Sequence, residues 1–315
     1  MHIIDTHCDV LWKLQERKRR QEQLDFAHDP DLQANLTRLK IGKVKLQFFA
    51  IFVHDKVPAN EKWQHALEQI DIFYEEIIGK HQEIKHIRDW WDLHTLKENE
   101  IGAVLSIEGL DMIGNDLMKL RQLIRLGVLA VGLTWNHANL CADGVGEVRG
   151  AGLTAFGEAV IRLLNEHKIM VDLSHASDAA FDDILARADY PFASHSNSRK
   201  IFPHQRNLTD TQAQALFQKE APVHLNLYPP FVHDEEAEEI LPYWRKHIDH
   251  FCALGGENYI GIGADFDGMD VVGEDMAHAG MYGNITEILL EDYPPKKVKK
   301  FTSMNFLRYI QKHFS

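Results

Sequence analysis

The sequence predicts an α/β protein with a (β/α)8 barrel fold. Strand-like and helical segments alternate along the chain, 315 residues suit eight such units with insertions, and no Pro-, Gly- or Ser-rich linker divides them. Right-handed crossovers between parallel strands give this alternation. A doubly wound open sheet is the alternative, since it shows the same alternation. We expect a single barrel domain over residues 1–315, with helical insertions and a C-terminal helix.

Eight segments have the features of buried strands. The first, 1–10, leads from β-branched residues into a polar cluster, and the second, 43–53, holds a continuous apolar run. Such a run is typical of a parallel sheet that is covered on both faces. The other six candidates cover residues 101–109, 128–135, 169–175, 191–196, 221–228 and 259–268.

Helical patterns occupy most of the intervals between these strands. We expect Ser177 to cap a helix over 177–188, and a long helix over 235–254. The segment 83–96 fits either a helix or a short excursion. The glycine-containing loop 136–153 is long enough to act as a lid over a site.

Composition and charge exclude several classes of partner. The chain is 45% hydrophobic and carries a formal net charge of −13, which argues against nucleic acid and anionic membranes. The three cysteines, Cys8, Cys141 and Cys252, are far apart and form no C-x-x-C pair, so neither a disulfide framework nor a zinc finger is indicated. With no signal peptide before the first strand and no membrane-spanning apolar run, we expect a cytoplasmic protein.

Polar side chains that can bind metals fall where the predicted strands end. In a (β/α)8 barrel, the carboxyl ends of the strands carry the active site. A scattered set of polar residues would not align in this way, so we expect these side chains to converge. They are His7, Asp9, Glu108, His175, His195 and Asp265.

Three histidines with carboxylates and no thiolate suit Zn²⁺ or a similar divalent ion. Five ligands are too many for one open catalytic zinc, but they suit two ions that share a bridging carboxylate. Glu108 is the expected bridge because its strand lies between the others. His7 and Asp9 would then complete one site, and His175 and His195 the other.

Four further residues are candidates for supporting roles. Asp265 could take a proton from the attacking water and pass it to a leaving amine, or be an ordinary turn aspartate. Asp5, two residues before His7, could orient that imidazole by a hydrogen bond. Arg206 could clamp a substrate carboxylate or be a solvated surface residue. Tyr228 could line the pocket or pack within the barrel.

The ordered set of motifs resembles the membrane dipeptidase (renal dipeptidase) family of binuclear zinc peptidases. The matching stretches span nearly the whole chain: DTHCDV, SIEG, LTWN, VDLSHAS, SHSNSR, RNLTD, NLY, GIGADFDG and NFLR. The resemblance implies a (β/α)8 barrel that binds two Zn²⁺ ions through the five residues above. It also implies that Asp265 is the acid–base carboxylate and that Arg206 holds the terminal carboxylate of a dipeptide.

The substrate implied by the resemblance is a dipeptide, in some members with a D-residue on its C-terminal side. A metal-activated hydroxide would attack its peptide carbonyl. One departure concerns the fourth strand, where mammalian members carry a histidine that helps to stabilise the intermediate. This sequence has Trp135 there, and same-face spacing could let His137 substitute.

Two rival functions remain open at this stage. The same site could hydrolyse another amide or a small lactone, such as an N-acyl amino acid substrate. The chain could also be a non-catalytic metal-binding protein. A homodimer is possible, since dimers are common in the family that the sequence resembles.

Overall fold

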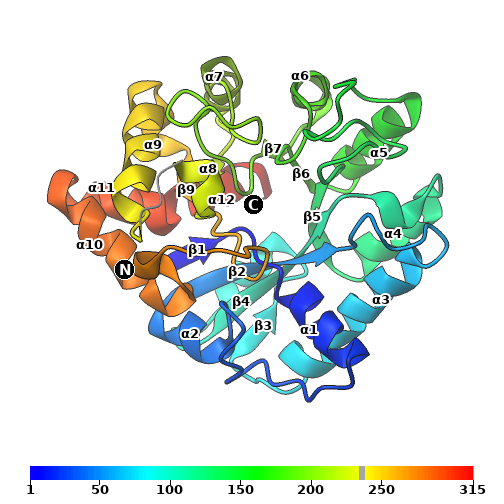
Figure 1. Cartoon of the computed structure of the whole chain (residues 1–315), viewed down its shortest axis with the longest axis horizontal. Coiled ribbons are helices and arrows are strands. Elements are labelled where there is room, and N and C mark those ends of the chain that lie inside the picture. Colours follow the sequence, from blue (N-terminus) through cyan, green and yellow to red (C-terminus); the bar gives the residue numbers. More distant parts are fainter. Residues whose placement is uncertain (234–237, 315) are drawn as a thin grey trace.

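The computed structural model describes residues 1–233 and 238–314 and shows a ring of parallel strands surrounded by helices (Figure 1). Neighbouring strands follow the order β7-β6-β5-β4-β2-β1-β9-β8, and a bridge between Ala193 and Val223 joins β7 to β8. The chain therefore forms a nearly closed (β/α)8 barrel, as predicted, and not an open sheet. The barrel strands are β1 (Ile3–Asp5), β2 (Val44–Phe52), β4 (Ile101–Glu108), β5 (Val128–Gly132), β6 (Met170–Asp172), β7 (Pro191–Phe192), β8 (Val223–Leu225) and β9 (Ile260–Ile262).

Most of these strands are shorter than the sequence predicts. β6, β7 and β9 each end three residues before the polar side chain that was expected to end them. The backbone at two of those residues, His175 and Asp265, has φ angles of +67° and +70°. This left-handed conformation cannot continue a strand and is uncommon outside glycine, so it turns the backbone out of the sheet at the site.

Helices cover the outside of the barrel. Ser177 caps α6 as predicted, because its Oγ accepts a hydrogen bond from the backbone N–H of Ala180 at 3.1 Å. The helix predicted over 235–254 is present from Leu241, whereas residues 235–237 lie outside the described part of the chain. The α-helices are α1 (Val10–Arg19), α2 (Leu36–Ile41), α3 (Lys62–Ile72), α4 (Leu117–Arg125), α5 (Ala155–Glu166), α6 (Asp178–Arg187), α7 (Asp210–Gln218), α8 (Pro229–Val232), α9 (Leu241–Ala253), α10 (Tyr282–Asp292), α11 (Pro295–Lys299) and α12 (Asn305–Phe314).

The ambiguous segment 83–96 contains a short strand and a helical turn. β3 (Ile84–His86) pairs in parallel with the first residues of β4, and a 3-10 turn follows over Trp90–Thr95. Asp89 begins this turn with a capping box, which explains why its sequence also reads as a helix start. The segment extends the sheet beside the barrel instead of adding a barrel strand.

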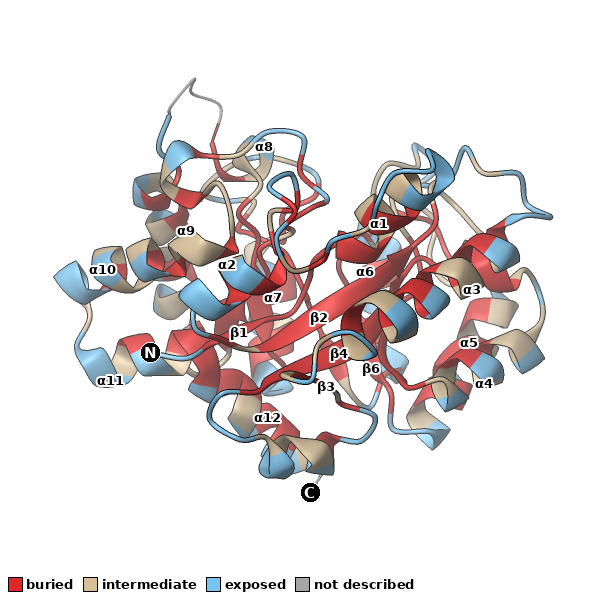
Figure 2. Cartoon of the chain, turned by 90° about the horizontal axis from the view of Figure 1, so that it is seen from below, coloured by how far each residue is buried: buried red, intermediate tan, exposed pale blue. Residues whose placement is uncertain are grey.

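The C-terminal helix closes the end of the barrel at which the strands begin. Asn305 donates a hydrogen bond to the carbonyl of Ile260 at 2.9 Å, and Tyr309 donates one to Pro191 at 3.0 Å. The ring of Phe306 packs against Phe48 inside the barrel at 5.7 Å. Figure 2 shows α12 below the buried strands, with the loops that follow the strands on the opposite side. The end of the barrel at which the strands finish is thus left open for a functional site.

Among the described residues, no helix combines the length and the apolar character needed to cross a bilayer.

Candidate metal centre and active site

The structure brings together the six side chains that the sequence places at strand ends. Glu108 is the last residue of β4, and His7 and Asp9 follow β1 by two and four residues. His175, His195 and Asp265 each stand three residues beyond a strand. Because all barrel strands are parallel, these positions meet at one end of the barrel.

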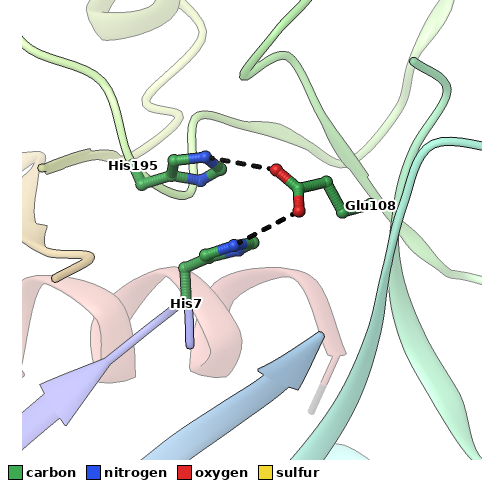
Figure 3. A group of neighbouring side chains, drawn as sticks. All are labelled: His7, Glu108 and His195. Carbon is green, nitrogen blue, oxygen red and sulfur yellow. Dashed lines mark ion pairs between the residues drawn. The ribbon is translucent and has the colours of Figure 1, made fainter. Parts of the chain in front are cut away.

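Glu108 lies at the centre of this group and presents a different oxygen to each half. Its Oε1 is 2.8 Å from Nε2 of His175 and 3.6 Å from Nε2 of His195. Its Oε2 is 3.7 Å from Nε2 of His7. Figure 3 shows His7 and His195, which follow β1 and β7, each facing one of the two oxygens. This arrangement suits a carboxylate that bridges two cations.

The half of the site around His7 contains polar atoms that the protein itself leaves unsatisfied. Nε2 of His7 lies 3.4 Å from Oδ2 of Asp9 and 3.7 Å from Oδ1 of Asp265. Nε2 of His7 and Oδ1 of Asp9 are buried and have no hydrogen-bond partner. Buried polar atoms normally have a partner, so this half is built to hold something else.

The other half contains two histidines whose ring nitrogens face each other. Nε2 of His175 is 2.9 Å from Nε2 of His195. The Nδ1 atom of His175 donates to Oδ1 of Asn136 at 2.8 Å. The Nδ1 atom of His195 lies 2.6 Å from Oγ of Ser194, whose own proton goes to the carboxylate of Asp172. Each ring therefore points an unprotonated nitrogen at the other, and a cation bound by both would remove the resulting repulsion.

Burial and charge set the protonation of these groups. Burial holds the pKa values of His175 and His195 well below 6.5, and the charges of Arg206 and His7 lower them further. Both rings are thus neutral at pH 7, the form that binds metals. Burial also lowers the pKa of His7, but Glu108 and Asp9 outweigh it and raise that pKa to about 10.

The pKa values of the carboxyl groups in the cluster are shifted upward. Burial raises the pKa values of Asp9 and Glu108. Burial is also the main reason that the pKa of Asp265 rises to about 7, and the negative charges of Asp9 and Glu108 add to it. A buried cluster of carboxylates is costly without further positive charge. The unpartnered Nε2 of His7, the facing nitrogens and this excess of carboxylates all fit divalent cations.

A cavity of about 310 Å³ opens onto the cluster and is wide enough for a small substrate. Glu108, His175 and Asp265 lie at its base, and aromatic side chains form much of its wall. The lining residues are Asp9, Trp12, Phe52, His54, Glu108, Trp135, Asn136, His175, Tyr228, Phe231, Asp265, Gly268 and Asp270. A larger hollow of about 1030 Å³ lies around the first residues of β2 and β4, away from this chemistry.

Asp5 acts on His7 in a different way from that predicted. Its Oδ1 accepts the backbone N–H groups of His7, at 3.2 Å, and Ala264, at 2.9 Å. Its Oδ2 accepts from Gln47 at 2.9 Å and from the hydroxyl of Tyr282 at 2.7 Å. These hydrogen bonds of Asp5 fix the backbone at His7 and not its ring, because the second oxygen of the carboxylate is turned toward Gln47 of β2 and Tyr282 of α10.

Trp135 and His137 differ in their relation to the cavity, although their rings lie only 6.3 Å apart. Trp135 lines the cavity, with its ring 5.1 Å from that of Phe52. The side chain of His137 is 58% exposed, does not line the cavity and lies 3.4 Å from Asp55. The expected substitution relied on strand parity, which is lost because β5 ends at Gly132. Besides His175, the cavity lining contains the imidazole of His54, whose ring lies 5.5 Å from that of Trp135.

Arg206 and Tyr228 are both close to the cavity. Arg206 is only 4% exposed and donates to Oγ of Ser196 at 3.2 Å and to the carbonyl of His195 at 3.1 Å. Its Nε is buried without a partner, and its guanidinium lies 5.8 Å from the ring of Phe231. It is therefore not a solvated surface residue. Tyr228 lines the cavity and is only partly buried, so it is not barrel packing.

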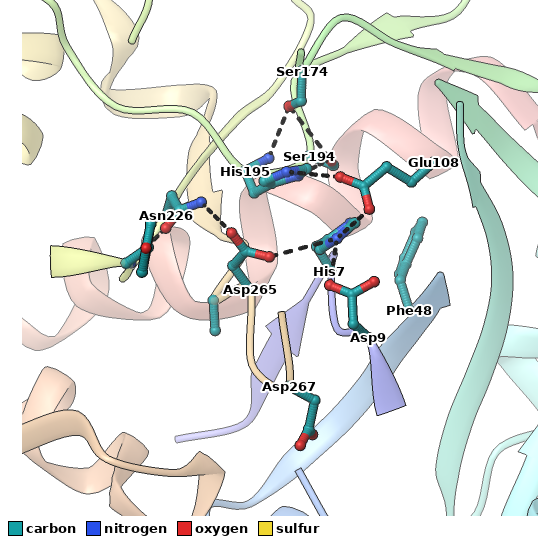
Figure 4. A network of polar contacts seen from close by, with 12 residues as sticks. His7, Asp9, Phe48, Glu108, Ser174, Ser194, His195, Asn226, Asp265 and Asp267 are labelled. Carbon is teal, nitrogen blue, oxygen red and sulfur yellow. Dashed lines mark hydrogen bonds and ion pairs between the residues drawn. The ribbon is translucent and has the colours of Figure 1, made fainter. Parts of the chain in front are cut away.

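Sequence reasoning missed the residues that hold the predicted ones in place. Asp172 accepts from the backbone of Ser194 at 2.9 Å and continues the chain of contacts that orients His195. Asn136 orients His175, and Asn226 donates to Oδ2 of Asp265 at 2.8 Å (Figure 4). All four supporting residues, Asp172, Ser194, Asn136 and Asn226, lie inside the quoted motifs VDLSHAS, SHSNSR, LTWN and NLY, and this is the signal that could have pointed to them.

A parallel barrel with a histidine–carboxylate cluster at the carboxyl ends of its strands defines a class of metal-dependent hydrolases. Comparison of the sequence with models of known protein families identifies the family within this class. Residues 1–313 match the model of the membrane dipeptidase family, peptidase family M19, and the chain belongs to this family. It is thus a dipeptidase of the metallopeptidase type, as the sequence motifs predicted, and the family implies a bound metal.

Individual relatives agree with this assignment. The chain is 28% identical to the uncharacterized dipeptidase C965.12 of Schizosaccharomyces pombe, over 98% of this chain and 80% of that protein. It is 29% identical to the dipeptidase aclJ of Aspergillus oryzae, over 92% of this chain and 72% of that protein. A metallopeptidase from Rhodobacter sphaeroides, crystallised with a phosphinate mimic of L-Ala-D-Ala, has the same fold, with a TM-score of 0.92, 23% identity and 99% of each chain covered.

Proposed function

We propose that this chain is a binuclear zinc dipeptidase. In this proposal His7 and Asp9 hold one ion, His175 and His195 hold the other, and Glu108 bridges them. The observation that carries the proposal is that the two carboxylate oxygens of Glu108 face different histidines. Oε1 lies 2.8 Å from Nε2 of His175, and Oε2 lies 3.7 Å from Nε2 of His7. Nitrogen and oxygen ligands without a thiolate favour zinc.

Bound zinc would lower the pKa of a coordinated water to about 7 and polarise the carbonyl of the substrate. The protein supplies the proton transfer. Asp265 turns Oδ1 toward His7, while its Oδ2 is held by Asn226. A carboxyl group with a pKa of about 7 can take a proton from the attacking water and return it to the leaving amine near neutral pH.

Arg206 holds the C-terminal carboxylate of the dipeptide in this proposal. Its guanidinium is buried beside Phe231, a cavity residue, and its Nε has no partner within the protein. A carboxylate can accept two parallel hydrogen bonds from an arginine, which fixes the peptide bond relative to the metals. The complex of the Rhodobacter protein leads us to include L-D dipeptides among the substrates.

The test is hydrolysis of Ala-Ala in its L-L and L-D forms by protein whose zinc content is measured by mass spectrometry. We expect two zinc ions per chain, and loss of activity on chelation that returns with zinc. Hydrolysis of N-acyl amino acids or lactones in preference to every dipeptide would instead favour the rival hydrolase. A fully metallated protein that hydrolyses nothing would sink the enzymatic proposal.

Two further expectations remain predictions. The three free cysteines, Cys8, Cys141 and Cys252, fit a reducing compartment and thus the cytoplasm. A homodimer can be checked by light scattering.

A further inference from the structure

The charged side chains that line the cavity are acidic and not basic. Its described lining includes no lysine and no arginine, but it includes four carboxylates. Three of them, Asp9, Glu108 and Asp265, surround His7 and are committed to the metal centre and the proton transfer. Asp270 makes none of these contacts. It is the carboxylate of the cavity that the chemistry does not use.

Asp270 is nevertheless held in a defined position. The hydroxyl of Tyr228 donates to its Oδ1 at 2.6 Å. Among the described residues, no lysine, arginine or histidine forms an ion pair with Asp270, whereas the other carboxylate near this rim, Asp55, lies 2.5 Å from His54 and 3.4 Å from His137. One oxygen of Asp270 is thus available to a cation, beside an aromatic ring whose face also attracts cations.

The rings of Phe231 and Tyr228 form a row between Arg206 and Asp270. The guanidinium of Arg206 lies 5.8 Å from the ring of Phe231, and that ring lies 4.9 Å from the ring of Tyr228. The unpartnered Nε of buried Arg206 is at one end of this row and the carboxylate of Asp270 at the other. A residue whose carboxylate binds Arg206 would therefore extend its side chain over Phe231 and Tyr228 toward Asp270.

We propose that this row is a subsite for a dipeptide whose C-terminal residue carries a cationic side chain, such as lysine or arginine. The inference rests on the proposed dipeptidase function and adds the substrate class. The hydrocarbon stem of such a side chain lies against the two rings, and its charged end pairs with Asp270. Asp270 is a specificity residue and takes no part in bond cleavage.

The test compares Ala-Lys with Ala-norleucine, which differ only by the terminal ammonium group. We expect kcat/KM to be about tenfold higher for Ala-Lys, from an exposed ion pair together with a cation–π contact. Asp270→Asn should lower this ratio to about threefold, because the ion pair is lost and only the cation–π contact remains. Asp270→Lys should reverse the preference, so that Ala-Glu is cleaved faster than Ala-Gln. Because each ratio is taken within one variant, a general loss of activity does not affect it.

Asp55→Asn is the matched control, since it removes a rim carboxylate that already has two imidazole partners, and it should keep the wild-type ratio. Binding of phosphinate analogues of Ala-Lys and Ala-norleucine, measured by calorimetry, reports the same ratio without turnover. A wild-type ratio near one, or a ratio that is undiminished in Asp270→Asn, overturns the subsite even if dipeptides are hydrolysed. A preference for Lys-Ala over norleucine-Ala, without one at the C-terminal position, overturns its placement.

Discussion

Asn226 donates from Nδ2 to Oδ2 of Asp265 at 2.8 Å, so the other oxygen, Oδ1, is the one that faces His7 (Figure 4). The amide cannot turn over, because its Oδ1 accepts the backbone N–H of Tyr228 at 2.5 Å. Asn197 in turn binds the backbone N–H of Asn226 at 3.1 Å and its carbonyl at 3.0 Å. The carboxylate that we propose as the acid–base group is thus oriented by a buried amide.

This relationship predicts that Asn226→Ala lowers kcat by about tenfold, since a misplaced catalytic group loses rate without losing substrate affinity. KM and zinc content should change little. The check is a double-mutant cycle with Asp265→Asn, in which Asn226→Ala should cost almost nothing further. Equal losses in both backgrounds would mean that Asn226 merely supports the fold.

Asp265→Asn itself should lower kcat by about 10²- to 10⁴-fold, the usual contribution of a general acid–base. Both zinc ions should stay bound, because the five proposed ligands remain. Steady-state kinetics with metal counting checks this. Loss of one ion would show instead that Asp265, which lies close to His7 and Asp9, is a ligand.

Ser194→Ala should weaken zinc binding by about ten- to a hundredfold, the usual effect of removing a partner that orients a ligating histidine. Ser194 connects Nδ1 of His195 to Asp172, so the ring would lose its fixed tautomer. Competition with a chelator measures the change. Ser106→Ala is the control, because the hydroxyl of Ser106 is buried without a partner and its removal should leave zinc affinity within about twofold.

Arg206→Ala should raise KM for dipeptides more than it lowers kcat, since the proposed clamp acts on the ground state as well as the transition state. The effect should nearly vanish for dipeptide amides, which lack the terminal carboxylate. Kinetics on Ala-Ala and its amide provide the measurement. An equal rise in KM for both substrates would remove the assigned role.

Stability should fall in acid partly through His247, which lies away from the metal centre. Burial lowers the pKa of His247 to about 4, although its bond to the carbonyl of Val232 opposes this. Its Nδ1 accepts the backbone N–H of Ser198 at 3.0 Å, so the folded state needs the neutral ring. This contribution is complete above the unfolded pKa of about 6.5 and is lost as the pH falls toward 4, by about 2 kcal/mol at pH 5.

His247→Gln keeps a donor and an acceptor but does not titrate. Urea unfolding at pH 7 and pH 5 should therefore show a smaller acid-induced loss of stability in this variant than in the wild type. The histidine ligands titrate in both proteins and cancel in the difference. An unchanged loss would contradict the assignment of this effect to His247.

The sequence by itself determined the barrel and the kinds of side chain at its open end. The eight strand segments follow from apolar runs and alternation, which are local properties. The position of Glu108, His175 and His195 near strand ends is also visible locally, since each lies at or near the end of a strand-like segment and can bind a metal. The ordered motifs then sufficed to predict the family.

Only the tertiary structure decided how these side chains are oriented. It directs Asp5 to the backbone of His7, pairs His137 with Asp55, and places Asn226 against Asp265. These contacts join residues from different strands and loops, and local patterns carry no information about them. At His175 and Asp265 the backbone also turns left-handed, so strand parity fails where the functional side chains begin. The physical reason is that orientation depends on packing across the barrel, whereas strand formation depends on neighbours in the chain.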